Sequence, residues 1–177
     1  MLEIKGKFIT LGGMLLADKP EVLKKVNVFL EEETGCTHLE LDPEEFYDLE
    51  IWAKMMEFFA GAFDDPTQAF IDFGKRFYPT MKRTGSLGVD LSSSNPMDYF
   101  NEEIHNSSDF MRGNDEEMAM MKKKILKQGD NYATIYSFVM DDSYHLQIGI
   151  WLGLFDMIGV EGGKVEYLGD SQFHLSW

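Results

Sequence analysis

The chain has 177 residues, of which 44% are hydrophobic, and a formal net charge of −15. This length and composition exclude a disordered chain and predict one domain, residues 1–177, with a core of its own. The acidic balance argues against nucleic acid and anionic membranes as partners, because phosphate-rich surfaces attract Lys and Arg.

Cysteine content and hydropathy narrow the class of protein further. Cys36 is the single cysteine, so the chain has neither an internal disulfide framework nor a thiolate cluster for a metal. No apolar run approaches the ~20 residues that a membrane-spanning helix needs. The N-terminus also lacks the basic-then-apolar layout of a signal peptide. We therefore expect a cytoplasmic protein with no membrane span.

Residues 1–129 are predicted to be mainly helical. A short strand is expected at Leu2–Ile4, and the glycines that follow it, as far as Gly13, leave their own segment undecided. Pro20 is placed as a first-turn proline and predicts a helix over Glu21–Glu33, which Gly35 ends.

Two further helix starts combine acidic residues with a proline at the first helical position. Asp42-Pro43-Glu44-Glu45 predicts a helix that runs to about Phe63. Asp64-Asp65-Pro66 repeats the signal for a helix over Thr67–Tyr78. Pro79 is expected to end that helix, because the residue before a proline avoids helical geometry.

Aromatic and methionine side chains follow one face of each of these two helices. Because the connection between the helices is short, both faces are expected to meet. Two interpretations stay open: a solid core, or an apolar pocket that suits an acyl chain or a flat ring, since Phe and Met leave gaps more readily than branched aliphatics. The candidate pocket residues are Met56, Phe59, Phe63, Phe70, Phe73 and Phe77.

The middle of the chain is predicted to be a long loop followed by a helix. Lys82–Asn95 is rich in Ser and Gly and is the longest predicted loop. Asn95-Pro96 then begins a helix that reaches about His105.

The lysine-rich segment before residue 130 has two interpretations. Acids from Asp115 onward and lysines up to Lys127 complement a helix dipole, with Gly129 as the stop, and this is the interpretation that we favour. The alternative is a strand over Lys122–Lys127 that forms a hairpin with the segment beginning at Asn131.

Residues 130–177 are predicted to form a strand, a helix and two more strands. Asn131–Val139 is rich in aromatic and β-branched residues, and Asp141-Asp142 ends this strand. Tyr144–Ile158 is apolar on most faces, which predicts a helix covered on more than one side. Lys164–Leu168 and Gln172–Trp177 are separated by a glycine turn that is typical of a hairpin.

Together these segments predict an α+β fold. Its helical N-terminal two-thirds pack on a small, mostly antiparallel C-terminal sheet with one crossing helix, Tyr144–Ile158. Gly149 and Gly153 lie one turn apart in that helix and predict close packing of the helix on the sheet.

No catalytic or metal-binding motif is found in the sequence. It contains no phosphate-binding glycine loop, no nucleophile elbow and no paired zinc-binding histidines. The four histidines, His38, His105, His145 and His174, are widely spaced. We therefore expect neither enzymatic activity nor a bound metal.

Several short motifs nevertheless resemble a known family. They are Lys5-Gly6, Ala69–Phe77 (AFIDFGKRF), Gln128–Tyr132 (QGDNY), the glycine-containing helix that ends at Gly159, and the closing Ser176-Trp177. This pattern is similar to that of a family of small proteins, abundant in myxobacteria, that end in Ser-Trp. More distantly, the layout resembles the superfamily that joins haem-NO/oxygen-binding (H-NOX) domains with vinyl-reductase-type and TRAPP-subunit-like domains.

The resemblance implies an H-NOX-like fold that holds a small ligand or mediates assembly. In H-NOX domains a helix histidine binds haem iron, and His105 occupies a comparable stretch. A Tyr-x-Ser-x-Arg motif holds the haem propionates in those domains. Here Tyr136–Met140 (YSFVM) has the wrong spacing and no arginine, so we expect no resident haem.

Three functions remain as hypotheses. The first is a non-enzymatic sensory or regulatory module that binds a small apolar ligand. The second is a protein-interaction adaptor whose acidic surface meets a basic partner. The third is a haem-based gas sensor with His105 as the iron ligand.

Overall fold

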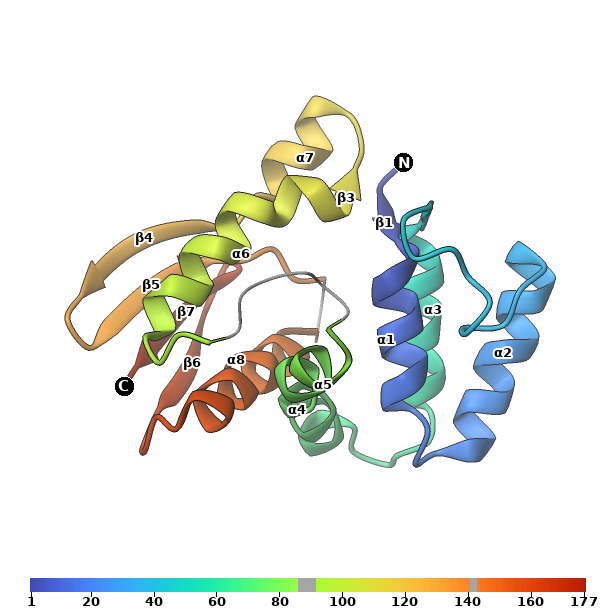
Figure 1. Ribbon diagram of the computed structural model, residues 1–177, viewed down its shortest axis with the longest axis horizontal. Helices are drawn as coiled ribbons and strands as arrows, with labels where there is room; N and C mark the ends of the chain where they lie inside the picture. The colour runs from blue at the N-terminus through green and yellow to red at the C-terminus, as the bar shows by residue number, and fades with distance from the viewer. Residues whose placement is uncertain (86–91, 141–142) are drawn as a thin grey trace.

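The computed structural model describes residues 1–85, 92–140 and 143–177. Three helices stand side by side at one end of the molecule (Figure 1). They are α1 (Gly6–Leu15), α2 (Pro20–Thr34) and α3 (Leu49–Ala60), and we call them the N-terminal layer. The predicted helix of Pro20 is confirmed, and Gly35 ends it with a positive φ of 76°.

A small antiparallel sheet connects the N-terminal layer to the rest of the chain. Its strand order is β2 (Phe46–Asp48), β1 (Glu3–Lys5) and β3 (Met111–Arg112). β1 therefore pairs with a segment more than a hundred residues away. The glycine-rich segment after β1, which the sequence left undecided, forms α1.

The predicted helix start at Asp42-Pro43 is wrong. The Asp42 carboxylate accepts a hydrogen bond from the Glu44 N–H at 2.9 Å, so the capping signal makes only a local turn. α3 begins at Leu49, and its cap is Asp48, which accepts from the Glu50 N–H at 2.9 Å. The reason is that residues 46–48 form the strand β2 instead. This strand pairs with β1, whose backbone N–H and C=O groups make the hydrogen bonds that a helix would otherwise provide.

The next predicted helix is divided into α4 (Thr67–Lys75) and α5 (Phe77–Thr84). Its start is confirmed, since Asp65 accepts from the Thr67 N–H at 2.9 Å. Pro79 does not end a helix, as we had expected, but lies in the first turn of α5. The N–H groups of a first turn have no partner within the helix, so a proline costs little there.

The predicted helix start at Asn95-Pro96 is confirmed in α6 (Pro96–Phe110), where Asn95 accepts from the Met97 N–H at 3.1 Å. This helix continues beyond His105, the predicted end. Of the predicted loop Lys82–Asn95, the first residues belong to α5, and residues 86–91 lie outside the described ranges.

The lysine-rich segment is a strand, so the interpretation that we favoured is wrong. α7 (Asp115–Met121) begins with a capping box and ends before the lysines. β4 (Lys124–Gly129) then pairs with β5 (Tyr132–Tyr136), as the alternative hairpin interpretation predicted. Cross-strand pairing therefore outweighs the favourable order of charges along a helix.

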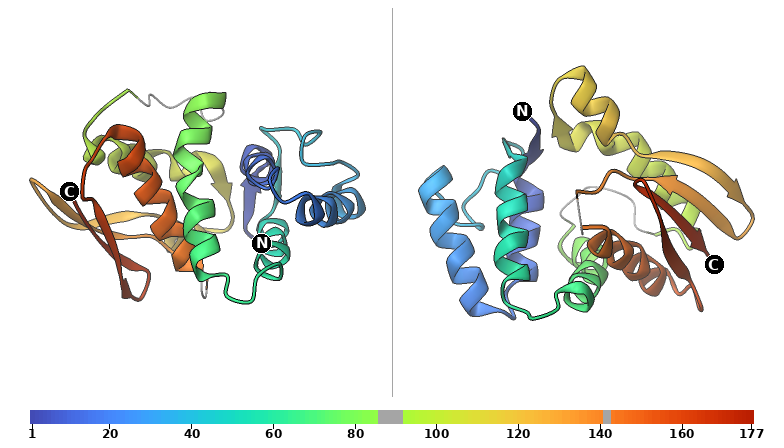
Figure 2. Two further views of the ribbon diagram at one scale, coloured as in Figure 1. Left: turned by 90° about the horizontal axis from the view of Figure 1, so that it is seen from below. Right: turned by 180° about the vertical axis from the view of Figure 1, so that it is seen from behind.

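The C-terminal sheet has the order β4-β5-β7-β6, with antiparallel neighbours throughout. Its last strands are β6 (Lys164–Gly169) and β7 (Gln172–Ser176). α8 (Tyr144–Ile158) lies against this sheet (Figure 2), and the Trp151 and Phe173 ring centroids are 5.0 Å apart. The shared sheet, the crossing helix and the α+β class are confirmed, while the predicted strand end at Asp141-Asp142 lies outside the described residues.

The glycines of α8 approach a helix rather than the sheet. A Cβ atom on Gly149 would lie 2.2 Å from the Ile71 carbonyl oxygen in α4, and one on Gly153 would lie 2.2 Å from the Lys75 carbonyl oxygen. From the other side, a Cβ on Gly74 would lie 2.4 Å from the Leu146 carbonyl oxygen. The prediction of close helix-on-sheet packing at these glycines is therefore wrong, because their Cα atoms meet the α4 backbone.

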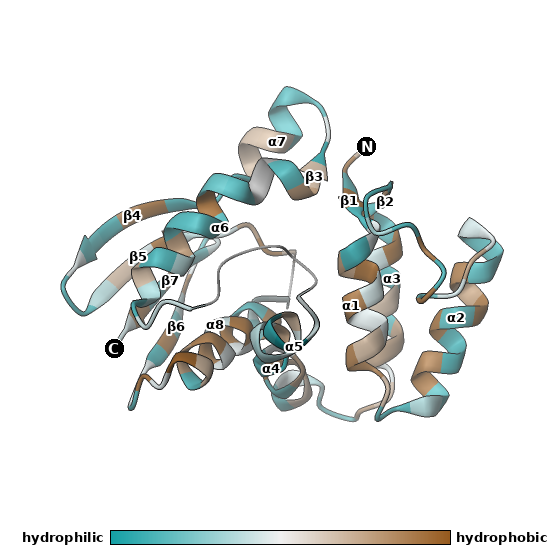
Figure 3. Ribbon diagram, in the orientation of Figure 1, coloured by the Kyte–Doolittle hydropathy of each residue, from teal (hydrophilic) through white to brown (hydrophobic). Residues whose placement is uncertain are grey.

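Hydrophobic side chains from the helical part and the sheet part form one connected buried cluster. α8 is hydrophobic along most of its length (Figure 3). This composition fits its position, since α4 and the C-terminal sheet cover it from two sides. None of the helices in the described ranges has the length and apolar character needed to cross a membrane.

Candidate functional site

The structure brings the predicted pocket phenylalanines together. The Phe59 ring centroid lies 5.1 Å from Phe63, 5.4 Å from Phe70 and 4.8 Å from Phe73. Phe73 continues the chain of rings to Phe77, with a centroid separation of 5.8 Å. We call these five residues the aromatic junction.

The aromatic junction lies where the N-terminal layer meets the rest of the molecule. Phe59 comes from α3, whereas Phe70 and Phe73 come from α4 and Phe77 from α5. Trp52 of α3 extends the contact, since its ring centroid is 6.0 Å from that of Phe77.

Cations from two directions lie at the edge of the aromatic junction. The Lys19 Nζ lies 5.2 Å from the Phe63 ring centroid, and the Arg76 guanidinium lies 5.6 Å from that of Phe73. Arg76 also forms an ion pair with Asp18 at 3.1 Å. Both partners of that pair are substantially exposed, so it adds little stability by itself.

Burial differs among the predicted pocket residues. Phe73 is 1% exposed and Phe59 is 2% exposed, and Met56 is also buried on α3. Phe63 is only partly buried. Phe63 is therefore the most accessible residue of the aromatic junction.

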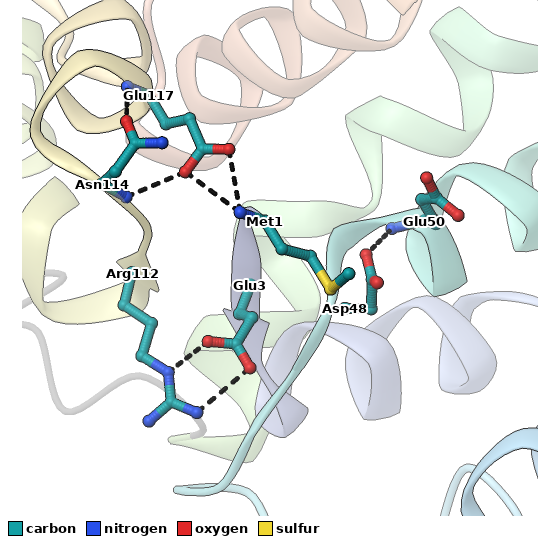
Figure 4. Close-up of polar contacts among 7 residues, drawn as sticks. All are labelled: Met1, Glu3, Asp48, Glu50, Arg112, Asn114 and Glu117. Carbon is teal, nitrogen blue, oxygen red and sulfur yellow. Dashed lines mark hydrogen bonds and ion pairs between the residues drawn. The ribbon is translucent and has the colours of Figure 1, made fainter.

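Polar contacts join the start of the chain, just before α1, to β3 and α7 (Figure 4). The Arg112 guanidinium donates two hydrogen bonds to the Glu3 carboxylate, which lowers the pKa of Glu3. The Met1 ammonium group forms an ion pair with Glu117 at 3.0 Å, and Glu117 accepts from the Asn114 N–H at 2.8 Å. The N-terminal part of the chain thus makes aromatic contacts on one side and polar contacts on the other.

A partly buried polar network joins α5 to α6. The Tyr78 hydroxyl donates to the Glu103 carboxylate, whose other oxygen lies 2.6 Å from the Lys123 Nζ. Burial, followed by the charge of Glu103, raises the pKa of Tyr78 well above its usual value. Tyr78 therefore stays protonated at neutral pH, and the group is a satisfied network rather than an acid–base pair.

The residues do not fit haem in the way that the resemblance implies. His105 is exposed on α6 and lies about 140° around the helix from the buried Phe100. Met140 stands where the arginine of the motif would be, and it is 40% exposed. No guanidinium is thus placed by this motif to neutralise propionates. Within the described residues, no group of three or more His, Cys, Asp and Glu side chains could hold a metal ion.

The sequence interpretation missed an open surface groove between α2, β2 and α3, which has a volume of about 630 Å³. Phe46 and Tyr47 line it from β2, and the prediction had placed both in a helix. The aromatic pair Phe46-Tyr47 directly before the capping residue Asp48 is the signal that could have revealed the strand. None of the six predicted pocket residues lines this groove.

Comparison with known proteins identifies the fold. No family model matches the chain, and no curated protein does. The Fe(II) unliganded H-NOX protein from K. algicida has a TM-score of 0.65 and 12% identity, covering 98% of this chain and 96% of that chain. A point mutant of that protein gives a TM-score of 0.66 with 13% identity, over 98% of this chain and 96% of its own. A doubly substituted Tt H-NOX protein gives 0.63 with 9% identity, over 98% of this chain and 95% of its own.

At these identities the likeness shows the fold alone. The chain has an H-NOX-like α+β fold over nearly its whole length. The distant resemblance to H-NOX domains inferred from the sequence is thereby supported.

Proposed function

We propose that this protein is a non-enzymatic sensory or regulatory module that binds a small apolar ligand at the aromatic junction. The observation that carries the proposal is the position of the junction, where Phe59 of α3 packs against Phe70 and Phe73 of α4. Trp52 of α3 likewise packs against Phe77 of α5. The H-NOX-like fold supports it, because one solved neighbour is described in its Fe(II) unliganded state and another by its haem distortion.

The chemistry of the junction favours an acyl chain or a flat ring. Its surfaces are aromatic, and sugars or nucleotides would need many more polar partners than it offers. A ligand there would lie beside the Phe59–Phe70 and Phe59–Phe73 contacts, which join the N-terminal layer to α4. Binding would therefore favour one arrangement of the N-terminal layer over another, which is the requirement for a sensor.

We test the proposal with two equally buried phenylalanines. Phe73 and Phe100 are each 1% exposed, but only Phe73 belongs to the aromatic junction. Phe100→Ala should cost about 3–5 kcal/mol of unfolding free energy, as in a solid core. Phe73→Ala should cost less and should change the affinity for an apolar fluorescent dye, because a ligand-accessible site already lacks some packing.

The dye is anilinonaphthalene sulfonate, and its binding is titrated well below the unfolding temperature. Near-ultraviolet circular dichroism confirms that each variant keeps its tertiary packing, since loosely packed states bind the same dye. The proposal fails if both variants lose the same stability and the unchanged protein binds no dye.

A protein-interaction adaptor is the second candidate function. The acid-lined surface groove on the N-terminal layer favours it, because a basic partner would be attracted to that surface.

A further inference from the structure

The groove on the N-terminal layer has an apolar floor built by three elements. Phe29 comes from α2, Phe46 and Tyr47 come from β2, and Ile51 and Ala53 come from α3. Phe29 is held in place by Phe58, since their ring centroids are 5.8 Å apart in an edge-to-face arrangement. The floor therefore presents aromatic and small aliphatic surface in a fixed shape.

Charged residues around this floor are mostly acidic. Glu33, Asp48, Glu50 and Glu57 line the groove together with one ammonium group, that of Lys54. Lys54 pairs with Glu57 at 2.5 Å, so the other three carboxylates carry the net charge of the rim. A positively charged group placed over the floor would be attracted to these three carboxylates.

Two cations lie over the Phe46 ring, and both pair with carboxylates outside the groove. The Lys5 Nζ and the Arg112 guanidinium lie 5.7 Å and 4.6 Å from the Phe46 ring centroid. Lys5 pairs with Glu44 at 2.5 Å, and Arg112 pairs with Glu3. The Glu44 carboxylate also pairs with Lys7 at 3.3 Å, so two lysines share it, and both Glu44 and Glu3 lie outside the groove.

A neighbouring groove provides an internal comparison. It shares Phe29 and has a volume of about 450 Å³, but its charged lining is balanced, with Glu21 and Glu32 against Lys24 and Lys25. The acidic rim therefore distinguishes the α2–β2–α3 groove from this neighbouring groove.

We propose that the α2–β2–α3 groove binds a basic peptide segment of a partner protein. One aromatic or aliphatic anchor of the segment occupies the floor, while flanking Lys or Arg side chains face Glu33, Asp48 and Glu50. Apolar anchors in a desolvated centre supply most of the energy of such contacts, and charges at the rim supply specificity and the association rate. This interface is separate from the aromatic junction and does not depend on a ligand there.

The test selects peptides of about 12 residues from a random displayed library against the full chain. The expected outcome is an excess of Lys and Arg around a single apolar anchor. The best peptide is then synthesised with a fluorophore, and its affinity is measured by anisotropy. Its affinity should fall as NaCl rises from about 0.05 M to about 0.5 M, because salt screens exposed charges.

Three variants locate the binding site. The double change Glu33→Lys with Glu50→Lys should weaken binding by about tenfold or more, since two attractive contacts become repulsive. Ala53→Trp should weaken it to a similar extent by filling the floor. Glu161→Lys with Glu166→Lys is the control, because both residues are exposed beyond α8 and the change in net charge is the same. This control should alter affinity by no more than about twofold.

Three outcomes would overturn the proposal. One is a selection that enriches no peptide or enriches peptides without basic residues. Another is an equal loss of affinity in the rim and control variants, with circular dichroism melting unchanged in both. The third is reversible self-association that the rim variant abolishes, since the occupant would then be a second copy of this chain.

Discussion

His38 illustrates, for a single residue, how packing decides the charge state. It is 6% exposed, and its Nδ1 lies 2.8 Å from the Asn27 Oδ1, which also accepts from the His38 N–H. The imidazole lies directly against α1, where a Cβ atom on Gly13 would come within 2.4 Å of the ring. Burial lowers the pKa of His38 below its usual 6.5.

This lowered pKa predicts a loss of stability in mild acid. Below about pH 6.5 the unfolded chain binds a proton at His38 that the folded chain does not, so the stabilisation present above that pH is lost as the pH falls. Urea unfolding between about pH 7.5 and pH 5.5 should therefore show a smaller fall in unfolding free energy for His38→Gln than for the unchanged protein.

His174→Gln is the matched control, because His174 lies only partly buried on β7. It removes a histidine elsewhere in the fold and gives the reference pH dependence. An identical pH dependence in His38→Gln and His174→Gln would show that His38 is not the responsible group.

For the helices, the sharpest consequence concerns the contact between α4 and α8. Gly149→Leu should destabilise the protein by about 3 kcal/mol, because the added side chain would meet the Ile71 carbonyl, a backbone atom that cannot turn aside. Asp156→Leu, on the exposed side of the same helix, should change stability by less than about 0.5 kcal/mol. Denaturant unfolding that leaves Gly149→Leu as stable as Asp156→Leu would contradict the observed helix contact.

The elements that the sequence predicted well are those whose signals are local. α8 has the predicted bounds, because Gly159 ends a mostly apolar run with a positive φ of 77°, although Ser143 makes no capping hydrogen bond at its start. The hairpin of β6 and β7 follows from a glycine turn between two apolar segments.

The elements that were predicted wrongly depend on partners distant in sequence. β2 is only three residues long and exists because β1 lies beside it. β4 became a strand because β5 pairs with it, although its charges suit a helix end. The glycines of α8 were recognised as close contacts, but the sequence could not say that α4 was the partner.

For the whole molecule, the candidate site could be predicted only in part. The phenylalanine faces of α3, α4 and α5 were inferred from helical spacing, and the structure brings those rings together. Whether they admit a ligand remains a prediction. The surface groove was not predicted, since it requires β2 to lie between α2 and α3, and no local pattern encodes that arrangement.

The contacts of the N-terminal layer suggest how binding could be transmitted. On one side the layer contacts the rest of the chain through the Phe59 ring. On the other it is connected through the small sheet, where Glu3 of β1 pairs with Arg112 of β3. A ligand that changes the aromatic contact would leave the connection through the sheet as a pivot.

A native mass spectrum of the purified protein tests the central claim most directly. We predict a bound apolar molecule, such as an acyl chain or a flat ring, which adds a discrete mass to the 20.4 kDa chain and which an apolar dye displaces. The Phe73→Ala variant should retain less of it than Phe100→Ala. A bare chain that binds no dye would contradict the ligand-binding function and favour the adaptor, whereas the mass and absorbance of haem would contradict our assignment of the ligand.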